Sequence, residues 1–316
     1  MIGYIVKRVL SLIPVLFIVS VIIFLIIHIT PGDPAASMLG MEATQVEIDA
    51  LNEKMGFNEP LPMQYKNWIL GVLKGDLGDS IYMQQPVTKA IKEHLPPTLA
   101  LALFAQMIAL IIAIPLGIIA AYKRGSAIDT AIMSLSLLGL AIPSFLLGLF
   151  LMLFFSVHLE LLPVAGYKPL SMGFATYIRY LILPGISLGV VQAALISRMV
   201  RSSMLDVLNL NYIKTARAKG LSERVVILKH ALKNAGLPIL TIVGQTFGTL
   251  VTGAVVIESL FNIPGIGQLI LNAITRRDIA VIQGVVLFVT LLYVIINLII
   301  DLLYGVIDPR VRLDKN

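Results

Sequence analysis

The sequence predicts an all-α integral membrane protein with six transmembrane helices and both termini on the cytoplasmic side. Hydrophobic residues make up 58% of the 316 positions and charged residues 13%, and the mean hydropathy is +0.92, which lies outside the range of soluble domains. Six uncharged runs of 17 residues or longer are present, and about 20 apolar residues in a helix cross a bilayer. The predicted spans are approximately residues 9–27, 98–122, 130–157, 181–197, 236–257 and 279–300.

The positions of the basic residues orient these spans. The net charge is +6, but the basic residues lie at span ends and in one loop, which retention on the cytoplasmic side explains better than nucleic-acid binding. Two precede the first span, two are Lys123 and Arg124, eight lie within 198–234 and three follow Asp301, whereas each short outer loop has two. The positive-inside rule therefore places both termini inside. We expect three parts: 1–29, 30–97 and 98–316.

The first span follows Lys7 and Arg8 and measures roughly 28 Å as a helix. A cleaved signal peptide is the alternative, but its apolar core has about 7–15 residues and an A-x-A site follows it. Neither feature is present here, so we interpret the run as a span. We expect it to end at 30–34, where two prolines prevent the helix from continuing.

The outer segment, 30–97, has nine acidic residues against five lysines and is expected to form three short amphipathic helices. Thr44 and Glu47 predict a capping box at the start of the first, which Gly56 would end. So small a segment has a limited core of its own, and we expect it to pack against the membrane helices.

Helical spacing of apolar residues predicts the other two outer helices. These residues are Tyr65, Trp68, Ile69, Val72 and Leu73, followed by Val87, Ile91 and Leu95. The glycines within 75–78 would end the second helix, and Pro96 with Pro97 would end the third.

The six uncharged runs contain no Asp, Glu, Lys, Arg or His, whereas ion-coupled transporters usually place ionisable groups or broken helices near the midplane. Proline and glycine are abundant at depth, which fits either small-residue helix packing or kinked helices that line a pathway. These residues are Pro115, Gly117, Gly139, Pro143, Gly148, Pro184, Gly185, Gly189, Gly244, Gly248 and Gly253. The polar residues that could face a pathway or a neighbouring helix are Gln106, Gln192, Gln245 and Asn297.

No enzymatic motif is present. The sequence lacks a phosphate-binding loop, an H-E-x-x-H motif and a G-x-S-x-G motif. It has no cysteine, and its four histidines are scattered. We therefore predict no catalytic, cofactor-binding or metal-binding residue, and any energy for transport must come from elsewhere.

The segment 198–234 is the longest polar stretch on the predicted cytoplasmic side. Residues 212–219 lack Gly and Pro and predict one helix, Gly220 can end it in a left-handed cap, and Ser222 can start a second helix. The expected apolar faces are Tyr212, Ile213 and Ala216 on the first helix, and Val225, Val226, Leu228, Ala231 and Leu232 on the second. Such a pair is either a docking surface or a basic loop that lies on lipid.

Motifs in order along nearly the whole chain resemble those of the permease subunits of bacterial ABC importers, in the dipeptide, oligopeptide and nickel branch. They are Lys7-Arg8 with Ile13-Pro14, Pro31-Gly32-Asp33-Pro34, Gly75-Asp76-Leu77-Gly78-x-Ser80, Thr215-Ala216-Arg217-Ala218-Lys219-Gly220-Leu221, His230-Ala231-Leu232-x-Asn234-Ala235, Glu258-x-x-Phe261-x-x-Pro264-Gly265-Ile266-Gly267, Arg277-Asp278, Gln283-Gly284, Asp301-Leu302-Leu303-Tyr304 and Asp308-Pro309-Arg310-x-Arg312.

The resemblance implies that 198–235 is a coupling loop whose helix sits in a groove of an ATPase subunit. Aligned on Gly220, the broad importer pattern E-A-A-x-x-x-G is kept only in part, and the later I-x-L-P keeps only its Leu. Positions that differ are Lys214, Thr215, His230 and Lys233; Ala216, Gly220 and Leu232 are kept. The implied coupling residues are Tyr212, Ala216, Arg217, Gly220, Leu221 and Ser222. We expect Ala216 and Gly220 to be the close-packing points.

The resemblance also implies a heteromeric importer in the bacterial cytoplasmic (inner) membrane. Its other members would be a second homologous permease, two ATPase subunits that bind ATP and Mg²⁺, and an external solute-binding protein that docks on the outer segment; no nucleic acid is implied. Peptides are the expected cargo, with nickel or a metal chelate as the alternative. A stand-alone channel or ion-coupled carrier, and a membrane-embedded enzyme or signalling anchor, are the alternatives from other classes.

Overall fold

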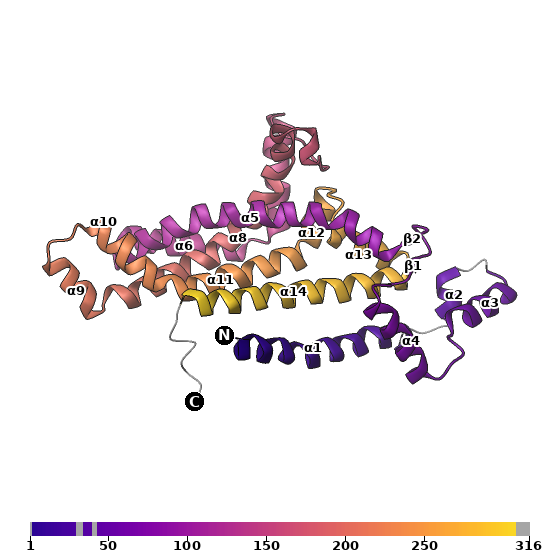
Figure 1. Ribbon diagram of the computed structural model, residues 1–316. Coiled ribbons are helices and arrows are strands. Elements are labelled where there is room, and N and C mark those ends of the chain that lie inside the picture. The colour runs from indigo at the N-terminus through magenta and orange to yellow at the C-terminus, as the bar shows by residue number, and fades with distance from the viewer. Residues whose placement is uncertain (1, 30–33, 40–42, 308–316) are drawn as a thin grey trace. The chain divides into compact units, whose positions relative to one another are not determined.

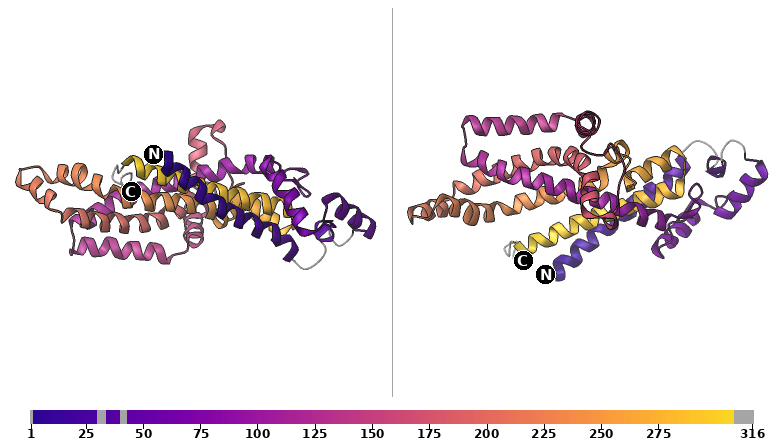
Figure 2. Two further views of the ribbon diagram at one scale, coloured as in Figure 1. Left: turned by 60° about the horizontal axis from the view of Figure 1, so that its bottom comes forward. Right: turned by 90° about the horizontal axis from the view of Figure 1, so that it is seen from above.

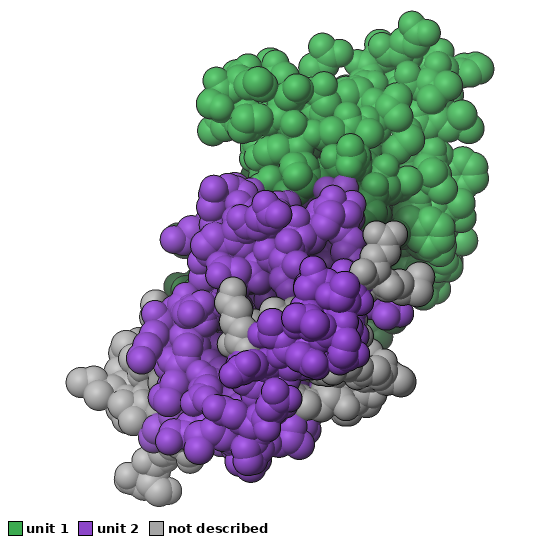
Figure 3. All heavy atoms as spheres, turned by 90° about the vertical axis from the view of Figure 1, so that its right-hand side faces the viewer, with its two compact units in different colours: residues 1, 97–264, 296–316 green, residues 2–96, 265–295 purple. Residues whose placement is uncertain are grey.

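The computed structural model describes residues 2–29, 34–39 and 43–307, and these are mostly helical (Figure 1). They divide into two compact units, coloured separately in Figure 3. Unit 1 contains residues 97–264 with the end of the chain from 296, and unit 2 contains residues 2–96 and 265–295. The described residues thus include most of each predicted part. The proline-rich break at 31–33 and the motif at 308–312 lie outside them.

Unit 2 combines the N-terminal helices with a later corner of the chain. Its elements are α1 (Ile2–Ile29), α2 (Pro34–Leu39), α3 (Gln45–Met55), α4 (Leu61–Leu73), β1 (Asp79–Ser80), β2 (Gln85–Pro86), the start of α5 (Val87–Tyr122), α13 (Ile266–Thr275) and the start of α14 (Ile279–Ile307). The strands pair antiparallel, with Asp79 opposite Pro86. The hairpin, α2 and α13 were not among the predicted elements.

The predicted outer helices are partly confirmed. Thr44 and Glu47 form the expected capping box at the start of α3, and Gly56 ends α3 in the left-handed region at φ 70°. Helix α4 packs on α1 as expected, because Tyr65 bonds Ser20 through the two hydroxyls at 2.8 Å and its ring meets Phe24 edge-on at 5.4 Å.

The prediction that Pro96 and Pro97 end a short third helix is wrong, since α5 continues through both prolines. The two prolines leave the carbonyls of Lys92 and Glu93 without helical donors. Both of these residues are exposed, so solvent can satisfy the carbonyls. Val87 and Ile91 are buried in a cluster with Val281 and Val285, and this packing holds the first turns of α5.

Unit 1 contains the central apolar helices. Its further elements are α6 (Ala127–Ala141), α7 (Ser144–Leu151), a π-helix (Met152–His158), a 3₁₀ turn (Leu170–Met172), α8 (Phe174–Leu208), α9 (Asn211–Ala218), α10 (Glu223–Val225), a π-helix (Val226–Ala231), α11 (Leu232–Gly253) and α12 (Val255–Leu260). The most extensive helix pairs are α8 with α11 and α8 with α6.

Within the described residues, four helices are long and apolar enough to cross a membrane: Val87–Tyr122, Phe174–Leu208, Glu223–Gly253 and Ile279–Leu303. A fifth span results if the bent pair Ala127–Ala141 and Ser144–His158 counts as one. The described apolar part of α1 is the shorter Leu12–Leu25. The structure therefore confirms several helices that are long and apolar enough to span a membrane, without fixing their number at six.

The predicted span at 130–157 is not one continuous helix. It bends by 95° between Ala141 and Ser144, and Figure 2 (right) displays α6 from the side with the next helix seen end-on. Ile142 is extended at ψ 120°, the conformation that a following proline ring favours for the residue before it.

Close helix packing explains several of the glycines at depth. A Cβ on Gly117 would lie 2.7 Å from the Ser197 carbonyl oxygen, and one on Gly189 would lie 2.8 Å from the Ala105 carbonyl oxygen. A Cβ on Gly244 would lie even closer to the Ile300 side chain. The small-residue packing interpretation therefore applies at these three positions.

Candidate functional site

The turn between α9 and α10 is the most distinctive surface feature of unit 1. Helix α9 ends at Ala218, Gly220 takes φ 78°, and α10 begins at Glu223. Gly220 is exposed, and an added Cβ there would meet no atom within 4 Å. The left-handed conformation therefore favours glycine, whereas the space around it is open.

The second helix of this pair is continuous with α11, so the prediction of two short helices is wrong for the second one. From Glu223 to Gly253 the chain is helical throughout, with a π-helix at Val226–Ala231 that leads into α11. No glycine or proline lies between Ser222 and Ala235 to stop it. Ser222 occupies the N-cap position, but its side chain makes no capping hydrogen bond. The turn is therefore attached to the end of a membrane helix.

The inner face of the pair is packed by the chain itself. Ile213 and Ala216 of α9 are buried in one cluster with Val226 and Ala231. Ala216 is only 8% exposed. The methyl group of Ala216 therefore contacts its own chain, and the expectation that Ala216 is presented to a groove on another protein does not fit this position.

The outer face carries exposed apolar side chains. These are Leu210, Tyr212, Leu221, Val225 and Leu228, and we call them the apolar turn surface. Leu228 is 59% exposed. Exposed large apolar groups that gather on one turn mark an interaction surface more often than isolated ones do.

Two sets of hydrogen bonds hold the turn in one shape. The Arg217 guanidinium donates to both carboxylate oxygens of Glu223, at 2.8 and 3.3 Å. The Asn234 amide donates to the Tyr212 hydroxyl at 2.9 Å and to the His230 carbonyl at 2.9 Å. The predicted residues Tyr212 and Arg217 thus fix the geometry that exposes Leu221.

The four predicted pathway residues occupy different environments. Gln106 is buried, and its amide donates to the Thr246 hydroxyl at 3.3 Å, which links α5 to α11. Gln245 is exposed and Asn297 is half-buried. The Gln192 side-chain oxygen is buried without a hydrogen-bond partner. Such an orphan acceptor is unfavourable unless a donor arrives from outside the chain.

Two buried polar pairs were missed by the sequence analysis. Arg201 on α8 makes a bidentate ion pair with Asp129 on α6, at 2.6 and 2.7 Å. The Thr98 hydroxyl donates to Glu258, which is fully buried, at 2.6 Å. Asp129 and Glu258 directly flank uncharged runs, and Arg201 lies four residues past one. This position, and for Glu258 its motif with Phe261, was the signal that the sequence offered.

No group of three His, Asp or Glu side chains in the described part of the chain could hold a metal ion.

Comparison with known families matches almost the whole chain. The profile described as "Binding-protein-dependent transport system inner membrane component" matches residues 113–313. The profile for the N-terminal region of such membrane components matches residues 1–102.

Several curated relatives are similar over their full length. The chain is 41% identical to a probable peptide ABC transporter permease protein, y4tP, of Sinorhizobium fredii, over 98% of this chain and 99% of the relative. It is 43% identical to a putative peptide transport system permease protein of Brucella abortus, over 99% and 100%. It is 41% identical to the glutathione transport system permease protein GsiC of Pectobacterium atrosepticum, over 99% of each.

Solved structures share the fold. Two inward-facing crystal forms of the MetNI methionine ABC transporter contain a chain that superposes with TM-scores of 0.59 and 0.58, at 18% and 20% identity. Each superposition covers 69% of this chain and 96% of the other.

Proposed function

Because this chain belongs to the family of binding-protein-dependent transport system inner membrane components, we propose that it is a permease subunit of an ATP-driven peptide importer in the bacterial inner membrane. Relatives that are 41–43% identical over nearly their whole length carry peptide or glutathione transport permease names. The proposed topology has six spans with both termini inside, so that the α9–α10 turn faces the cytosol.

The observation that carries the coupling part of this proposal is the apolar turn surface. It is exposed, held by Arg217–Glu223 and Tyr212–Asn234 contacts, and joined without a break to α11. A partner that moves this surface also moves the end of a long membrane helix. We assign the coupling contact to Tyr212, Arg217, Gly220, Leu221 and Ser222, and give Ala216 the role of packing α9 onto its own chain.

The proposed partners would supply the energy for transport and the other half of the substrate pathway. Two ATPase subunits with bound ATP and Mg²⁺ would supply the energy, and a second permease would complete the pathway. A coupling free energy of about 1–3 kcal/mol between two sites changes affinities about 5–150-fold, and about 5.5 kcal/mol would switch two conformations from 1:99 to 99:1. Closure of the two ATPase subunits on one turn from each permease would have to supply the free energy that switches the two conformations.

An extracytoplasmic solute-binding protein is the remaining proposed partner, and the acidic helix α3 is its proposed docking element. Val46 is 78% exposed there, beside the exposed carboxylates of Glu47 and Asp49. Replacing residues 43–58 with a short glycine linker is expected to abolish uptake while leaving α4 packed on α1. Unchanged uptake would contradict the docking role.

For the pathway we propose Gln192, Gln245 and Asn297. The orphan oxygen of Gln192 needs a donor, and the backbone N–H of a peptide or a residue of the second permease would supply one. For Gln106, whose amide donates to the Thr246 hydroxyl, we propose a role in helix packing in place of the pathway role expected from the sequence.

The coupling assignment is tested by Gly220→Trp, with peptide-stimulated ATP hydrolysis measured in the reconstituted complex. The indole adds bulk to the proposed contact, so we expect the complex to assemble and stimulation to be lost. Gly173→Trp is the matched control, since Gly173 also has positive φ, 103°, and no atom within 4 Å of an added Cβ. Full stimulation in Gly220→Trp, or equal loss in Gly173→Trp, would sink the assignment.

The choice of cargo has its own test. Mass spectrometry of the ligand that co-purifies with the binding protein should identify peptides; nickel or a metal chelate would replace the peptide proposal. Solute flux through vesicles that hold this chain alone, without nucleotide, would instead favour a stand-alone channel.

A further inference from the structure

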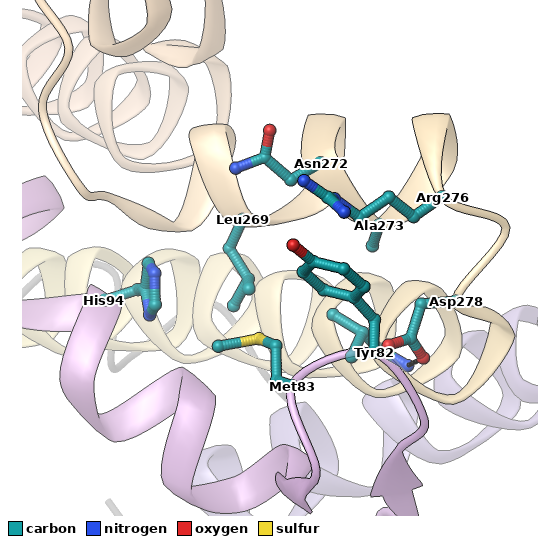
Figure 4. A pocket seen from close by; sticks show the side chains of 9 residues that line it. Tyr82, Met83, His94, Leu269, Asn272, Ala273, Arg276 and Asp278 are labelled. Carbon is teal, nitrogen blue, oxygen red and sulfur yellow. Dashed lines mark hydrogen bonds between the residues drawn. The ribbon is translucent and has the colours of Figure 1, made fainter.

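A pocket of about 270 Å³ lies within unit 2, between the β1–β2 hairpin and α13 (Figure 4). Tyr82 at the hairpin tip and Arg276 at the end of α13 form its rim, and Figure 4 displays the Arg276 guanidinium above the Tyr82 ring and close to the Asn272 amide. Met83, Leu269 and Val281 give the interior an apolar character. In the proposed topology this pocket opens to the outside.

The pocket is built on fixed backbone. The Ser80 hydroxyl donates to Asp278 at 2.5 Å and accepts from the Met83 N–H at 2.8 Å, which ties the hairpin to the corner between α13 and α14. Gln84 and Arg277 take φ 49° and 54°, a region that costs free energy for residues with a side chain and persists where surrounding contacts enforce it. Such residues cluster at ligand-binding sites.

The positively charged side chain of Arg276 contacts the aromatic ring of Tyr82 and makes no ion pair with a described carboxylate. Its guanidinium carbon lies 3.5 Å from the Tyr82 ring centroid, which is a cation–π contact. No carboxylate in the described part of the chain lies within ion-pair distance of Arg276. The fork of N–H donors on an arginine matches a carboxylate in geometry.

The one acidic residue of the pocket is already engaged. Asp278 caps α14, because its carboxylate accepts the Val281 N–H at 3.4 Å as well as the Ser80 hydroxyl. The positive end of α14 compensates its charge. Arg277, next in the chain, is exposed and does not line the pocket. His94, which also lines the pocket, turns its Nδ1 to the Ala90 carbonyl at 2.8 Å.

We propose that this pocket binds the carboxyl-terminal residue of a peptide, with the terminal carboxylate on Arg276 and Asn272 and the last side chain among Met83, Leu269 and Val281. The inference deepens the proposed function and rests on it. The pocket volume of about 270 Å³ lies just below the range of about 300–1,000 Å³ for small-molecule sites, so the pocket has room for a terminal residue with its carboxylate. A cationic rim over an apolar interior matches a chain end that carries both a charge and a side chain.

Uptake in the reconstituted complex tests the proposal with a peptide and its carboxyl-terminal amide. For the wild type we expect amidation to lower the initial uptake rate about tenfold or more, the loss typical of a hydrogen bond to a charged group. Arg276→Gln should lower uptake of the free peptide by a similar factor and make amidation nearly without effect. Any preference of the solute-binding protein for the free peptide over the amide is the same for the wild type and Arg276→Gln. It therefore cancels when the effect of amidation is compared between the two proteins.

Arg277→Gln is the matched control, because Arg277 is exposed and adjacent but does not line the pocket, and Gln84 demonstrates that glutamine takes the same φ in this chain. It should retain the wild-type response to amidation. Equal losses for both peptides in Arg276→Gln would indicate a carboxylate from a partner protein and overturn the proposal, as would an Arg276→Gln variant with wild-type behaviour.

A binding measurement separates this proposal from the proposed function. The chain has no cysteine, so Met83→Cys introduces a single thiol into the pocket. In the solubilised complex, the free peptide should slow labelling of this thiol by a maleimide, and the amide should not. Protection of the thiol without ATP-driven uptake would support peptide binding in the pocket and contradict the proposed importer function. Uptake without protection would contradict peptide binding in the pocket alone.

Discussion

The turn between α9 and α10 and the β1–β2 hairpin are both short corners that expose apolar groups, but they are held in opposite ways. The turn is closed by contacts between near neighbours in the chain, six residues apart for Arg217–Glu223 and 22 for Asn234–Tyr212. The hairpin is closed by Ser80–Asp278, across 198 residues. The turn is thus a self-contained unit at the end of α11, whereas the hairpin depends on a distant corner.

The largest expected effect is the loss of the long-range contact. Asp278→Ala removes a helix cap, worth about 1 kcal/mol, and a buried charge-assisted hydrogen bond, worth about 1.5–3 kcal/mol. We expect a loss of about 2–4 kcal/mol, measured as a lower thermal unfolding midpoint of the purified complex. Asp278→Asn, which can still cap the helix, should lose less. An unchanged unfolding midpoint for Asp278→Ala would contradict the claim that the hairpin, unlike the α9–α10 turn, depends on a long-range contact.

The local ion pair should contribute less to stability and more to coupling. Arg217 and Glu223 are 39% and 42% exposed, and such pairs contribute about 0.2–1 kcal/mol. Arg217→Glu should therefore leave the midpoint nearly unchanged but reduce peptide-stimulated ATP hydrolysis several-fold. Because Arg217 is assigned to the coupling contact, the double variant Arg217→Glu with Glu223→Arg should not restore it. Full restoration would mean that the pair only shapes the turn and that Arg217 does not contact the partner.

The smallest effect concerns a cap formed entirely by local contacts. The Thr44 backbone N–H and hydroxyl both donate to Glu47, each at 2.8 Å, and these hydrogen bonds lower the pKa of Glu47 below 4.5. Because the folded-state pKa is the lower one, this stabilisation is present above the unfolded pKa and is lost as the pH falls through the folded pKa.

Amide hydrogen-exchange protection at the start of α3 should accordingly decrease on acidification below pH 4.5. Thr44→Ala should lower the protection at neutral pH and weaken the dependence of this protection on pH. The reason is that the Glu47 carboxylate would then keep only one donor, the backbone N–H of residue 44. A pH dependence as steep as that of the wild type would contradict this account of the cap.

The same contrast explains what could be predicted from the sequence. Thr44, Glu47 and Gly56, and the left-handed turn at Gly220, act through neighbours within a few residues, so their motifs sufficed. The Ser80 and Asp278 motifs were both recognised in the sequence, but nothing in their spacing indicates that they meet. The pocket beside the hairpin could therefore not be predicted.

Two errors have related physical causes. The break expected at Pro96 and Pro97 follows from local propensity, which packing of Val87 and Ile91 overrides. The apolar stripe through Ile213 and Ala216 was predicted correctly, yet an apolar stripe does not reveal which surface will cover it. The chain itself covers Ala216, and the surface left for a partner is the neighbouring one around Leu221.

Site-specific crosslinking from that surface tests the central claim most directly. With no cysteine in the chain, Leu221→Cys can carry a single benzophenone maleimide in the assembled complex. We predict a crosslink to an ATPase subunit that changes in yield when ATP is trapped, and none from Leu73→Cys, which is 77% exposed in the outer segment. A crosslink to the ATPase from position 73, or none from position 221, would contradict the account.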